Sequence, residues 1–207
     1  MKLLLLRHEE RNLEEPFFHT SLTKKGFENA NTNILLHLSK FKINKIYCSP
    51  FLRCIQTIYP YCSIHKKKIN IENSLYECLN NTKFISTYLH NCDSIEDENI
   101  LKIKNKKYNS FLHIDYFRYY LCKNNIITQL EIKEEFKKRI ISFIDLLIKK
   151  KTKTNENTNT NTNNTVLIIS HEAVLREIQI YIEYNILKNN RFYYNFIKMG
   201  EIIEIDL

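Results

Sequence analysis

Two histidines of this sequence follow apolar runs that are typical of buried strands. Arg7 and His8 come directly after the leucine-rich run 2–6, and His171 follows the run 166–170. Open α/β sheets bind their ligands beyond the carboxyl ends of the strands, where the strand order changes direction. We therefore expect His8 and His171, which are far apart in the chain, to lie in one site.

A turn delivers a second arginine to the same edge of the expected sheet. The short apolar run 46–48 ends at Ser49 and Pro50, and Arg53 falls in the first turn of the helix that is predicted to follow. The expected site therefore contains two histidines and two arginines from three strand ends.

These residue types suit the transfer of a phosphoryl group. A neutral imidazole can attack phosphorus and hold the phosphoryl group as phosphohistidine, provided that nearby cations keep the ring deprotonated and bind the charged oxygens. Guanidinium groups match phosphate oxygens in two-point geometry and keep their charge, so Arg7, Arg53 and Arg11 are the expected ligands. His171 begins a predicted helix and is placed to donate to the transferring oxygens. A carboxyl group must then protonate the leaving oxygen.

Alternating strand and helix patterns position these residues and predict a parallel sheet. The amphipathic pattern over residues 22–38 predicts a helix with Thr23 as its N-cap. A second helix is predicted over residues 51–59, because Pro60 cannot continue it. The strands predicted in this half of the chain cover residues 2–6, 43–48 and 69–71.

The second half of the chain alternates regular and irregular patterns. Residues 80–125 are expected to form an irregular insertion or lid beside the site. Residues 131–150 carry apolar side chains on one side and predict a long helix. Segment 151–165 is almost entirely Asn, Thr and Lys, has nothing to bury and is predicted to be a low-complexity mobile loop. The remaining predicted elements are a strand over 166–169, a helix over 172–184 and edge strands near 191–197 and 201–205.

Length and composition favour one α/β domain spanning residues 1–207. The first apolar run is too short for a signal peptide, and no stretch approaches the roughly 18 to 20 apolar residues of a membrane span. We therefore expect a cytoplasmic protein with no membrane partner. The formal charge of +8 accompanies a general abundance of Lys, Asn and Ile, so the lysine runs are interpreted as solvated and no nucleic-acid partner is expected.

The cysteines favour neither metal binding nor thiol catalysis. They form no C-x-x-C pair and no tight cluster, so reduced thiols are expected, with no metal site and no cofactor. The residue six after Cys48 is Cys54 and not an arginine, which rules out the spacing of a cysteine phosphatase loop. The six cysteines are Cys48, Cys54, Cys62, Cys78, Cys92 and Cys122.

Four segments resemble, in order, the motifs of the histidine phosphatase, or phosphoglycerate mutase-like, superfamily. The segments are Leu6–Arg11, Leu22–Gly26 with Ala30, Ser49–Thr57 and Ser170–Arg176. The resemblance implies a three-layer α/β/α sandwich with a mostly parallel central sheet and helices on both faces. It also implies a phosphohistidine at His8, no metal, and a phosphate site of Arg7, Arg53 and His171.

The same resemblance implies a general acid. In the mutase-like branch this acid is a glutamate after the second arginine motif, often preceded two residues earlier by leucine. Glu77 follows Leu75 at that place and is the candidate acid, with Glu72 and Glu9 as alternatives. Arg11 stands three residues after the first histidine, where the acid-phosphatase branch has another phosphate-binding arginine.

The sequence departs from the family pattern at two positions next to the histidines, and these departures leave both an active enzyme and an inactive binding protein as alternatives. Glu9 and Glu172 stand where the family usually has glycine after each histidine. These carboxylates either obstruct phosphate, or they point away or pair with arginines.

The expected function is therefore a metal-independent phosphatase acting on a phosphorylated metabolite or a phosphoprotein. The alternative is a catalytically impaired protein that binds a phosphate ligand or acts as a scaffold. A phosphoglycerate-type mutase ranks last, because residues 78–81 differ from the mutase stretch after the acid and the chain has no Trp.

Overall fold

A five-stranded sheet forms the centre of the computed structural model, which describes residues 1–12, 20–78, 131–157 and 164–207. The strands are β1 (Lys2–Arg7), β2 (Ile43–Cys48), β3 (Asn70–Ile71), β4 (Thr165–Ser170) and β5 (Ile202–Asp206), in the order β3-β2-β4-β1-β5. The helical elements are α1 (Lys24–Asn29), η1 (Ala30–Ile34), α2 (Leu35–Leu38), α3 (Leu52–His65), η2 (Asn73–Leu75), α7 (Lys133–Asn157), α8 (Glu172–Tyr181) and η3 (Ile182–Ile186). The predicted α/β class, with a mostly parallel sheet, is confirmed.

The register of the sheet aligns the strand ends that precede the two histidines. β1 and β4 are parallel, and their last residues, Arg7 and Ser170, are partners in the ladder. β2 pairs with the other edge of β4, also in parallel, and β5 runs antiparallel to β1. His8 and His171 are therefore the first residues beyond two adjacent, equally long strands.

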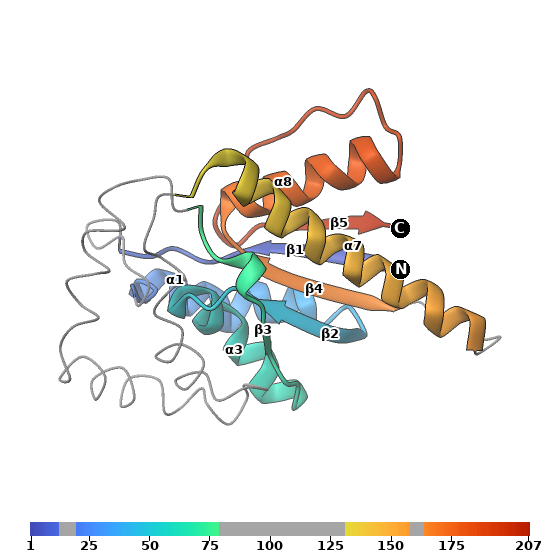
Figure 1. Ribbon diagram of the computed structural model, residues 1–207. Coiled ribbons are helices and arrows are strands. Elements are labelled where there is room, and N and C mark those ends of the chain that lie inside the picture. The colour runs from blue at the N-terminus through green and yellow to red at the C-terminus, as the bar shows by residue number, and fades with distance from the viewer. Residues whose placement is uncertain (13–19, 79–130, 158–163) are drawn as a thin grey trace, which may run out of the picture.

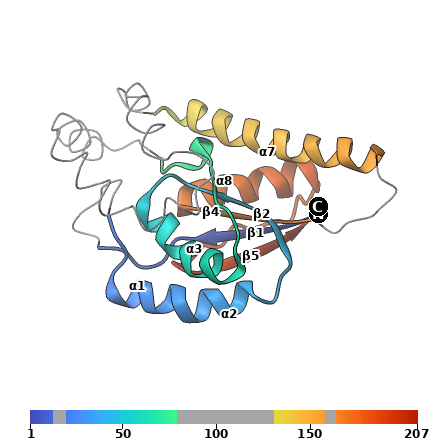
Figure 2. The same ribbon diagram turned by 90° about the horizontal axis from the view of Figure 1, so that it is seen from below.

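Helices cover both faces of the sheet (Figures 1 and 2). The connections from β1 to β2 and from β2 to β3 move in one direction along the sheet and place α1, α2 and α3 on one face. The connection from β3 to β4 returns in the opposite direction and places α7, with α8 beside it, on the other face. Crossovers between parallel strands are almost always right-handed, so reversing the direction changes the face that the helix covers.

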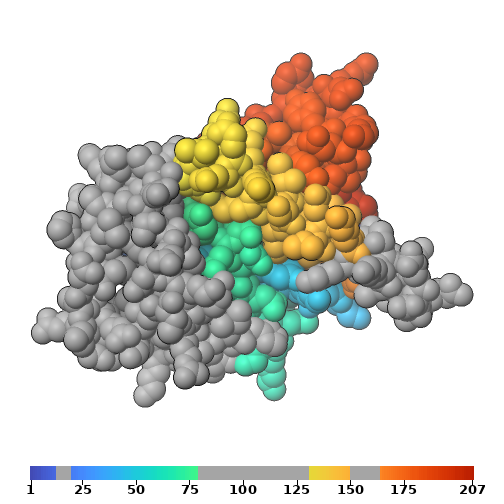
Figure 3. Space-filling view, in the orientation of Figure 1, coloured from blue at the N-terminus to red at the C-terminus, as the bar shows by residue number. Residues whose placement is uncertain are grey.

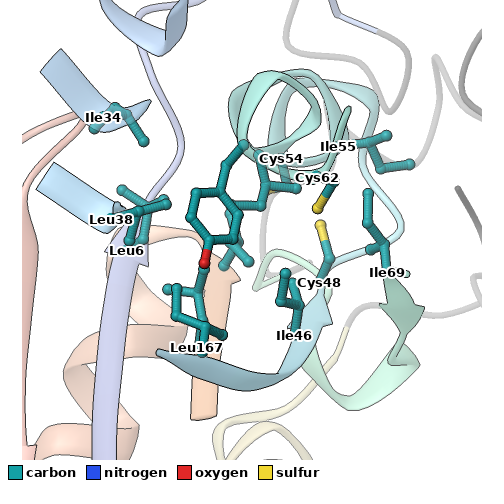
Figure 4. Close-up of a cluster of buried hydrophobic side chains, with 14 of the residues drawn as sticks. Leu6, Ile34, Leu38, Ile46, Cys48, Cys54, Ile55, Cys62, Ile69 and Leu167 are labelled. Carbon is teal, nitrogen blue, oxygen red and sulfur yellow. The ribbon is translucent and has the colours of Figure 1, made fainter. Parts of the chain in front are cut away.

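Alternate residues of the central strands fill two separate hydrophobic cores. Leu4 and Leu6 of β1 face the α3 side, where Figure 4 shows Leu6, Ile46, Ile55 and Leu167 in one cluster. Leu3 and Leu5 face the α7 and α8 side. Both faces of these strands are buried, and this explains why they read as continuous apolar runs.

The first helical region follows the prediction over residues 22–38. Thr23 is the N-cap, and its hydroxyl oxygen accepts a hydrogen bond from the Gly26 N–H at 3.1 Å. The helix contains a π-helical turn, η1, before it continues as α2.

The predicted end of the second helix at residue 59 was wrong. Pro60 lies inside α3, which continues to His65 and ends at Lys66 in the left-handed conformation, with φ at 51°. The proline lacks the N–H that would bond to the preceding turn, at a cost of about 3 kcal/mol. Tyr61 and Cys62 directly after it are buried in the core, and burying each apolar side chain contributes roughly 1.5 to 3 kcal/mol. Packing thus outweighs the lost hydrogen bond.

Two further boundaries differ from the predictions. Helix α7 runs to Asn157, seven residues beyond residue 150 and into the segment expected as a mobile loop. Once a helix is nucleated, each added residue gains a hydrogen bond at little cost, so a polar sequence can extend it. β4 begins at Thr165, the last residue of that predicted loop. The insertion or lid predicted over residues 80–125 lies outside the described residues.

The edge strand predicted near residues 191–197 does not form, whereas the one near 201–205 appears as β5. Side chains satisfy the backbone of this segment in place of a ladder. The Ile197 N–H donates to the Tyr194 hydroxyl at 3.2 Å, and the Ile197 carbonyl accepts from Arg7 Nη1 at 2.6 Å. Within the described parts of the chain, no helix is long and apolar enough to cross a membrane.

Gly26 is expected to be essential for the packing of α1, although it lies in a helix. A Cβ at this position would come within 2.3 Å of the Glu10 carbonyl oxygen. Gly26→Ala should therefore lower the free energy of unfolding by about 2 kcal/mol, despite the gain in helix propensity. Lys24→Ala, at an exposed position of the same helix, should stay within about 0.5 kcal/mol of wild type. Urea unfolding measures both, and a Gly26→Ala variant as stable as Lys24→Ala would contradict the close approach.

Candidate active site

The carboxyl edge of the sheet gathers the residues that the sequence pointed to. The His8 N–H donates to the Ser170 carbonyl at 3.1 Å, and the Ser49 N–H donates to the Ile169 carbonyl at 2.9 Å. His171 is the N-cap residue of α8. Backbone hydrogen bonds between neighbouring strands thus continue past the strand ends, and they hold the backbone of His8 and Ser49 in place.

Arg53 lies at the centre of the site, fully buried in the first turn of α3. Its Nε donates to His8 Nε2 at 3.2 Å, and its Nη2 lies 3.2 Å from His171 Nδ1. The same Nη2 lies 3.6 Å from a carboxylate oxygen of Glu77. The ring of Phe51 packs against the guanidinium, 4.4 Å from ring centroid to Cζ. One side chain thereby contacts both histidines and the candidate acid.

The hydrogen bonds of His8 define its tautomer. Its Nδ1 lies 2.8 Å from the Glu9 carbonyl oxygen, which can only accept, so Nδ1 carries the proton. Nε2 then carries the lone pair, in agreement with its role as acceptor for Arg53. A backbone carbonyl that orients a histidine in this way leaves the other ring nitrogen available as a nucleophile.

His171 lies beside His8, with 5.2 Å between the ring centroids and an interplanar angle of 64°. Its Nε2 lies 2.9 Å from the Ser49 hydroxyl, and its Nδ1 lies 3.2 Å from the Glu77 carboxylate. Phe51 packs edge-on against the same ring. The second histidine is therefore held between β2, α3 and the acid.

Burial and the arginine charges keep both histidines neutral. Desolvation is the largest cause that lowers the pKa of His8 and of His171 well below the ordinary value of 6.5, and the charge of Arg53 lowers both further. Burial also lowers the pKa of Arg53 to about 10, so this guanidinium stays charged at neutral pH. For Glu77 the same desolvation raises the pKa, while Arg53 opposes the rise. A neutral histidine and a carboxyl group with a raised pKa thus lie close together, as nucleophilic and general acid catalysis would require.

Among the three candidate acids, Glu77 is the only one whose carboxylate contacts a histidine of the site in the described part of the chain. Glu72 instead accepts a hydrogen bond from the Ser74 N–H at 2.8 Å and caps η2. The Glu9 side chain is buried, and its Oε2 accepts from the Glu10 N–H at 3.2 Å.

Arg7 and Arg11 act on the site mainly through their charges. Arg7 donates to the Ile197 carbonyl with Nη1, and its buried Nε has no hydrogen-bond partner among the described residues. Arg11 donates to the Asn12 carbonyl at 2.9 Å. The charge of Arg11 also lowers the pKa of His8 and of Glu77. With Arg53, three cations surround one candidate acid, which suits a dianionic phosphate group.

The two glutamates that replace family glycines are bound to other parts of the chain. Glu9 Oε1 would lie 2.0 Å from a Cβ at Gly200, whose φ is 75°, so only glycine fits beside it. Glu172 accepts a hydrogen bond from the Tyr194 hydroxyl and lies 3.8 Å from Arg176. Neither carboxylate makes a hydrogen bond to a histidine of the site among the described contacts.

Sequence reasoning missed two residues that support the site. The Thr57 hydroxyl donates to the Arg53 carbonyl at 2.7 Å and accepts from the Glu9 N–H at 3.0 Å, joining α3 to the end of β1. Arg139 on α7 binds the backbone near Glu77. A signal for Arg139 existed, because it falls on the apolar side of its helix between Phe136 and Phe143.

Cys48 and Cys54, which lie near this site, are buried, and burial disfavours their reactive thiolate form. Burial raises the pKa of the Cys54 thiol to about 12, and burial also raises the pKa of the Cys48 thiol. The described segments contain no group of three or more metal-ligating side chains that could hold an ion.

Comparison with known proteins agrees with this geometry. Residues 3–82 match the model of the histidine phosphatase superfamily, branch 1. The matched region, which is less than half of the chain, is similar to this superfamily. No curated protein matches it in sequence.

Solved structures with the same α/β fold match nearly the whole chain. The α-ribazole phosphatase from Shigella flexneri is 20% identical with a TM-score of 0.63, covering 100% of this chain and 91% of its own. The phosphoserine phosphatase from Entamoeba histolytica in complex with phosphoserine is 16% identical with a TM-score of 0.57, covering 98% and 89%. A phosphoglycerate mutase from Bacillus anthracis is 18% identical with a TM-score of 0.63, covering 99% and 86%. At these identities the likeness establishes the fold and leaves the reaction open.

The buried neutral histidines should make this protein sensitive to acid. Because their folded-state pKa is lowered, the unfolded chain binds more protons as the pH falls below the ordinary histidine value of 6.5. The free energy of unfolding should decrease on acidification by up to about 1.4 kcal/mol per pH unit for each histidine. His171→Gln should make this decrease shallower.

Denaturant unfolding between pH 7 and pH 5 measures this slope. His65→Gln is the matched control, because His65 is exposed on the surface of α3. An unchanged slope in His171→Gln would show that the His171 ring is not buried as a neutral group.

Proposed function

We propose that this chain is a metal-independent phosphatase that works through a phosphohistidine at His8. The observation that carries the proposal is the tautomer of this ring, whose Nδ1–H donates to a backbone carbonyl while Nε2 keeps its lone pair beside Arg53. The substrate is a phosphorylated metabolite or a phosphoprotein.

The first step transfers the phosphoryl group to the enzyme. The lone pair of His8 Nε2 forms a bond to phosphorus, and the ester P–O bond breaks. The leaving oxygen takes the proton of the Glu77 carboxyl group, whose raised pKa favours the acid form. The Arg53 hydrogen bond to Nε2 passes to a phosphate oxygen as the substrate arrives, which frees the lone pair for attack.

The second step releases phosphate. A water molecule attacks phosphorus and gives a proton to the Glu77 carboxylate, and the N–P bond returns its electron pair to Nε2. The products are the alcohol and inorganic phosphate, and the enzyme regains its initial protonation state.

The charged groups of the site fit the phosphate in both steps. The buried, unpartnered Nε of Arg7 is a donor that a phosphate oxygen would satisfy. His171 stands at the N-terminus of the ten-residue helix α8, where backbone N–H groups and the helix dipole favour anions. Arginine charge takes the place that a metal ion has in other phosphatases.

The contacts of the two unusual glutamates favour turnover over a scaffold role. Glu9 is turned toward Gly200, and Glu172 is bound by Tyr194, so neither occupies the space between the histidines. The names of structural relatives, an α-ribazole phosphatase and a phosphoserine phosphatase with phosphoserine, support a small phosphorylated molecule as substrate.

His8→Ala should abolish both turnover and covalent labelling. A phosphoramidate on His8 should be stable in alkali and labile in acid, and peptide mapping after quenched labelling would locate it. EDTA should leave the rate unchanged. Label on Ser49 or Cys54 would show that the nucleophile is wrong, and a wild type that binds vanadate without turning over any substrate would favour the scaffold.

Glu77→Gln should slow poor leaving groups much more than good ones. An alkyl phosphate needs protonation of its leaving oxygen and should lose about 100-fold in kcat/KM, in the range typical of general acid catalysis. The phenolate of p-nitrophenyl phosphate needs little protonation, so its loss should stay below about tenfold. Glu72→Gln is the control, and a larger effect there would move the acid to Glu72.

A further inference from the structure

The candidate acid itself lies in no helix or strand. Glu77 follows η2 and precedes the end of this described part of the chain at residue 78. Its carboxylate accepts from the neighbouring Cys78 N–H at 3.1 Å, a contact that would move with the segment. The position of Glu77 therefore depends on what holds the backbone of residues 74–77, here called the acid segment.

Arg139 of α7 binds three carbonyls of the acid segment. Its Nη1 donates to the Ser74 carbonyl at 2.6 Å, and its Nη2 lies 3.0 Å from the Tyr76 carbonyl and 3.4 Å from that of Glu77. Figures 1 and 3 show the acid segment passing against the first turns of α7. The remaining carbonyl, of Leu75, accepts from the Ser170 hydroxyl at 2.7 Å. All four carbonyls are thus held by side chains from other elements.

Arg139 is itself fixed on two sides. Its Nε and Nη2 bind the two carboxylate oxygens of Glu131 at 2.5 and 3.0 Å, in a bidentate pair that is largely buried. Its Cζ lies 3.6 Å from the ring centroid of Tyr76, whose hydroxyl donates to Glu131 at 3.2 Å. A planar group with five donors meets all these partners at once, and a lysine ammonium with three donors could not.

We infer that Arg139 is a positioning residue, which holds the acid segment so that the Glu77 carboxyl group stays beside His171 and Arg53. The inference rests on the proposed function, because it assigns to Arg139 the task of presenting the proton donor. Arg139 does not touch the phosphate. It keeps the acid where the leaving oxygen of a phosphate on His8 takes its proton as the ester P–O bond breaks.

A positioning role predicts a dependence on the leaving group. Without the Arg139 contacts, the acid segment can move and Glu77 is less often placed for proton transfer. Arg139→Met should lower kcat/KM for an alkyl phosphate by at least tenfold and for p-nitrophenyl phosphate by less than threefold. Arg139→Lys should retain an intermediate activity on the alkyl phosphate. Lys137, on the same helix as Arg139, pairs with Glu177 of α8, and Lys137→Met should leave both rates unchanged.

A double-mutant cycle separates positioning from general destabilisation. If Arg139 acts through Glu77, then Arg139→Met should cost little further activity in the Glu77→Gln background. Equal losses on both substrates, or a full additive loss in that background, would overturn the inference. If Arg139→Met fails to fold, Arg139→Lys and Ser170→Ala carry the test, because each weakens the hold on the acid segment with a smaller change in packing.

A readout without turnover makes the two proposals distinguishable. The carboxyl carbon of Glu77, assigned by its loss in Glu77→Gln, can be titrated by carbon-13 NMR. Its titration midpoint should move toward the ordinary glutamate value in Arg139→Met, because a carboxyl group that leaves its buried place loses the desolvation that raises its pKa. An unmoved midpoint would overturn the inference. A wild type that forms no phosphohistidine would overturn the proposed function, while the titration still decides whether Arg139 holds Glu77.

Discussion

The buried guanidinium of Arg53 is the group on which the organisation of this site depends. A charge with no solvent exposure is costly to bury unless polar partners surround it. Its partners here are the ring nitrogens of His8 and His171 and the carboxyl group of Glu77. The same charge favours the neutral form of both rings. One buried cation thus brings these side chains together and favours the neutral form of His8 that the proposed attack needs.

The sheet supplies the rigid frame that this arrangement needs. Parallel pairing of β1 with β4 aligns Arg7 with Ser170, so that the two histidines leave the sheet at the same level. The parallel neighbour β2 ends at Cys48, and the following turn starts α3 with Arg53 in its first turn. Thr57 ties that helix back to the end of β1. The side chains of His8, His171 and Arg53 therefore extend from the ends of paired strands and the start of a helix. Backbone hydrogen bonds restrict movement at these places.

Glu77, the candidate acid, is held in place differently from His8, the proposed nucleophile. Glu77 lies in no strand or helix. Its backbone segment is held by hydrogen bonds from Arg139 of α7 and Ser170 of β4. The largely buried Glu131 pairs with the Arg139 charge and so offsets the cost of bringing it among backbone carbonyls. The site therefore depends on both faces of the sheet, because Arg53 comes from the α3 side and Arg139 from the α7 side.

The sequence by itself predicted the five strands of the sheet, together with a sixth that does not form, and it predicted most of the helices and the residues that the structure gathers at the site. Short continuous apolar runs are typical of strands buried on both faces, and His8, Arg53 and His171 directly follow such runs or their turns. These signals are local, because each is contained in one short stretch of the sequence. The family motifs add Glu77 as an expectation, which the structure places beside His171.

Tertiary structure alone decided the features that depend on distant partners. Pro60 remains inside α3 because residues after it are buried, and the segment 191–197 forms no strand because side chains satisfy its backbone. The contacts of Glu9 with Gly200, and of Arg139 with the acid segment, join residues that are far apart in the chain. A sequence pattern records which residues are apolar or charged, but it does not record which partner reaches them. That information exists only once the strand register and the crossovers have brought distant residues together.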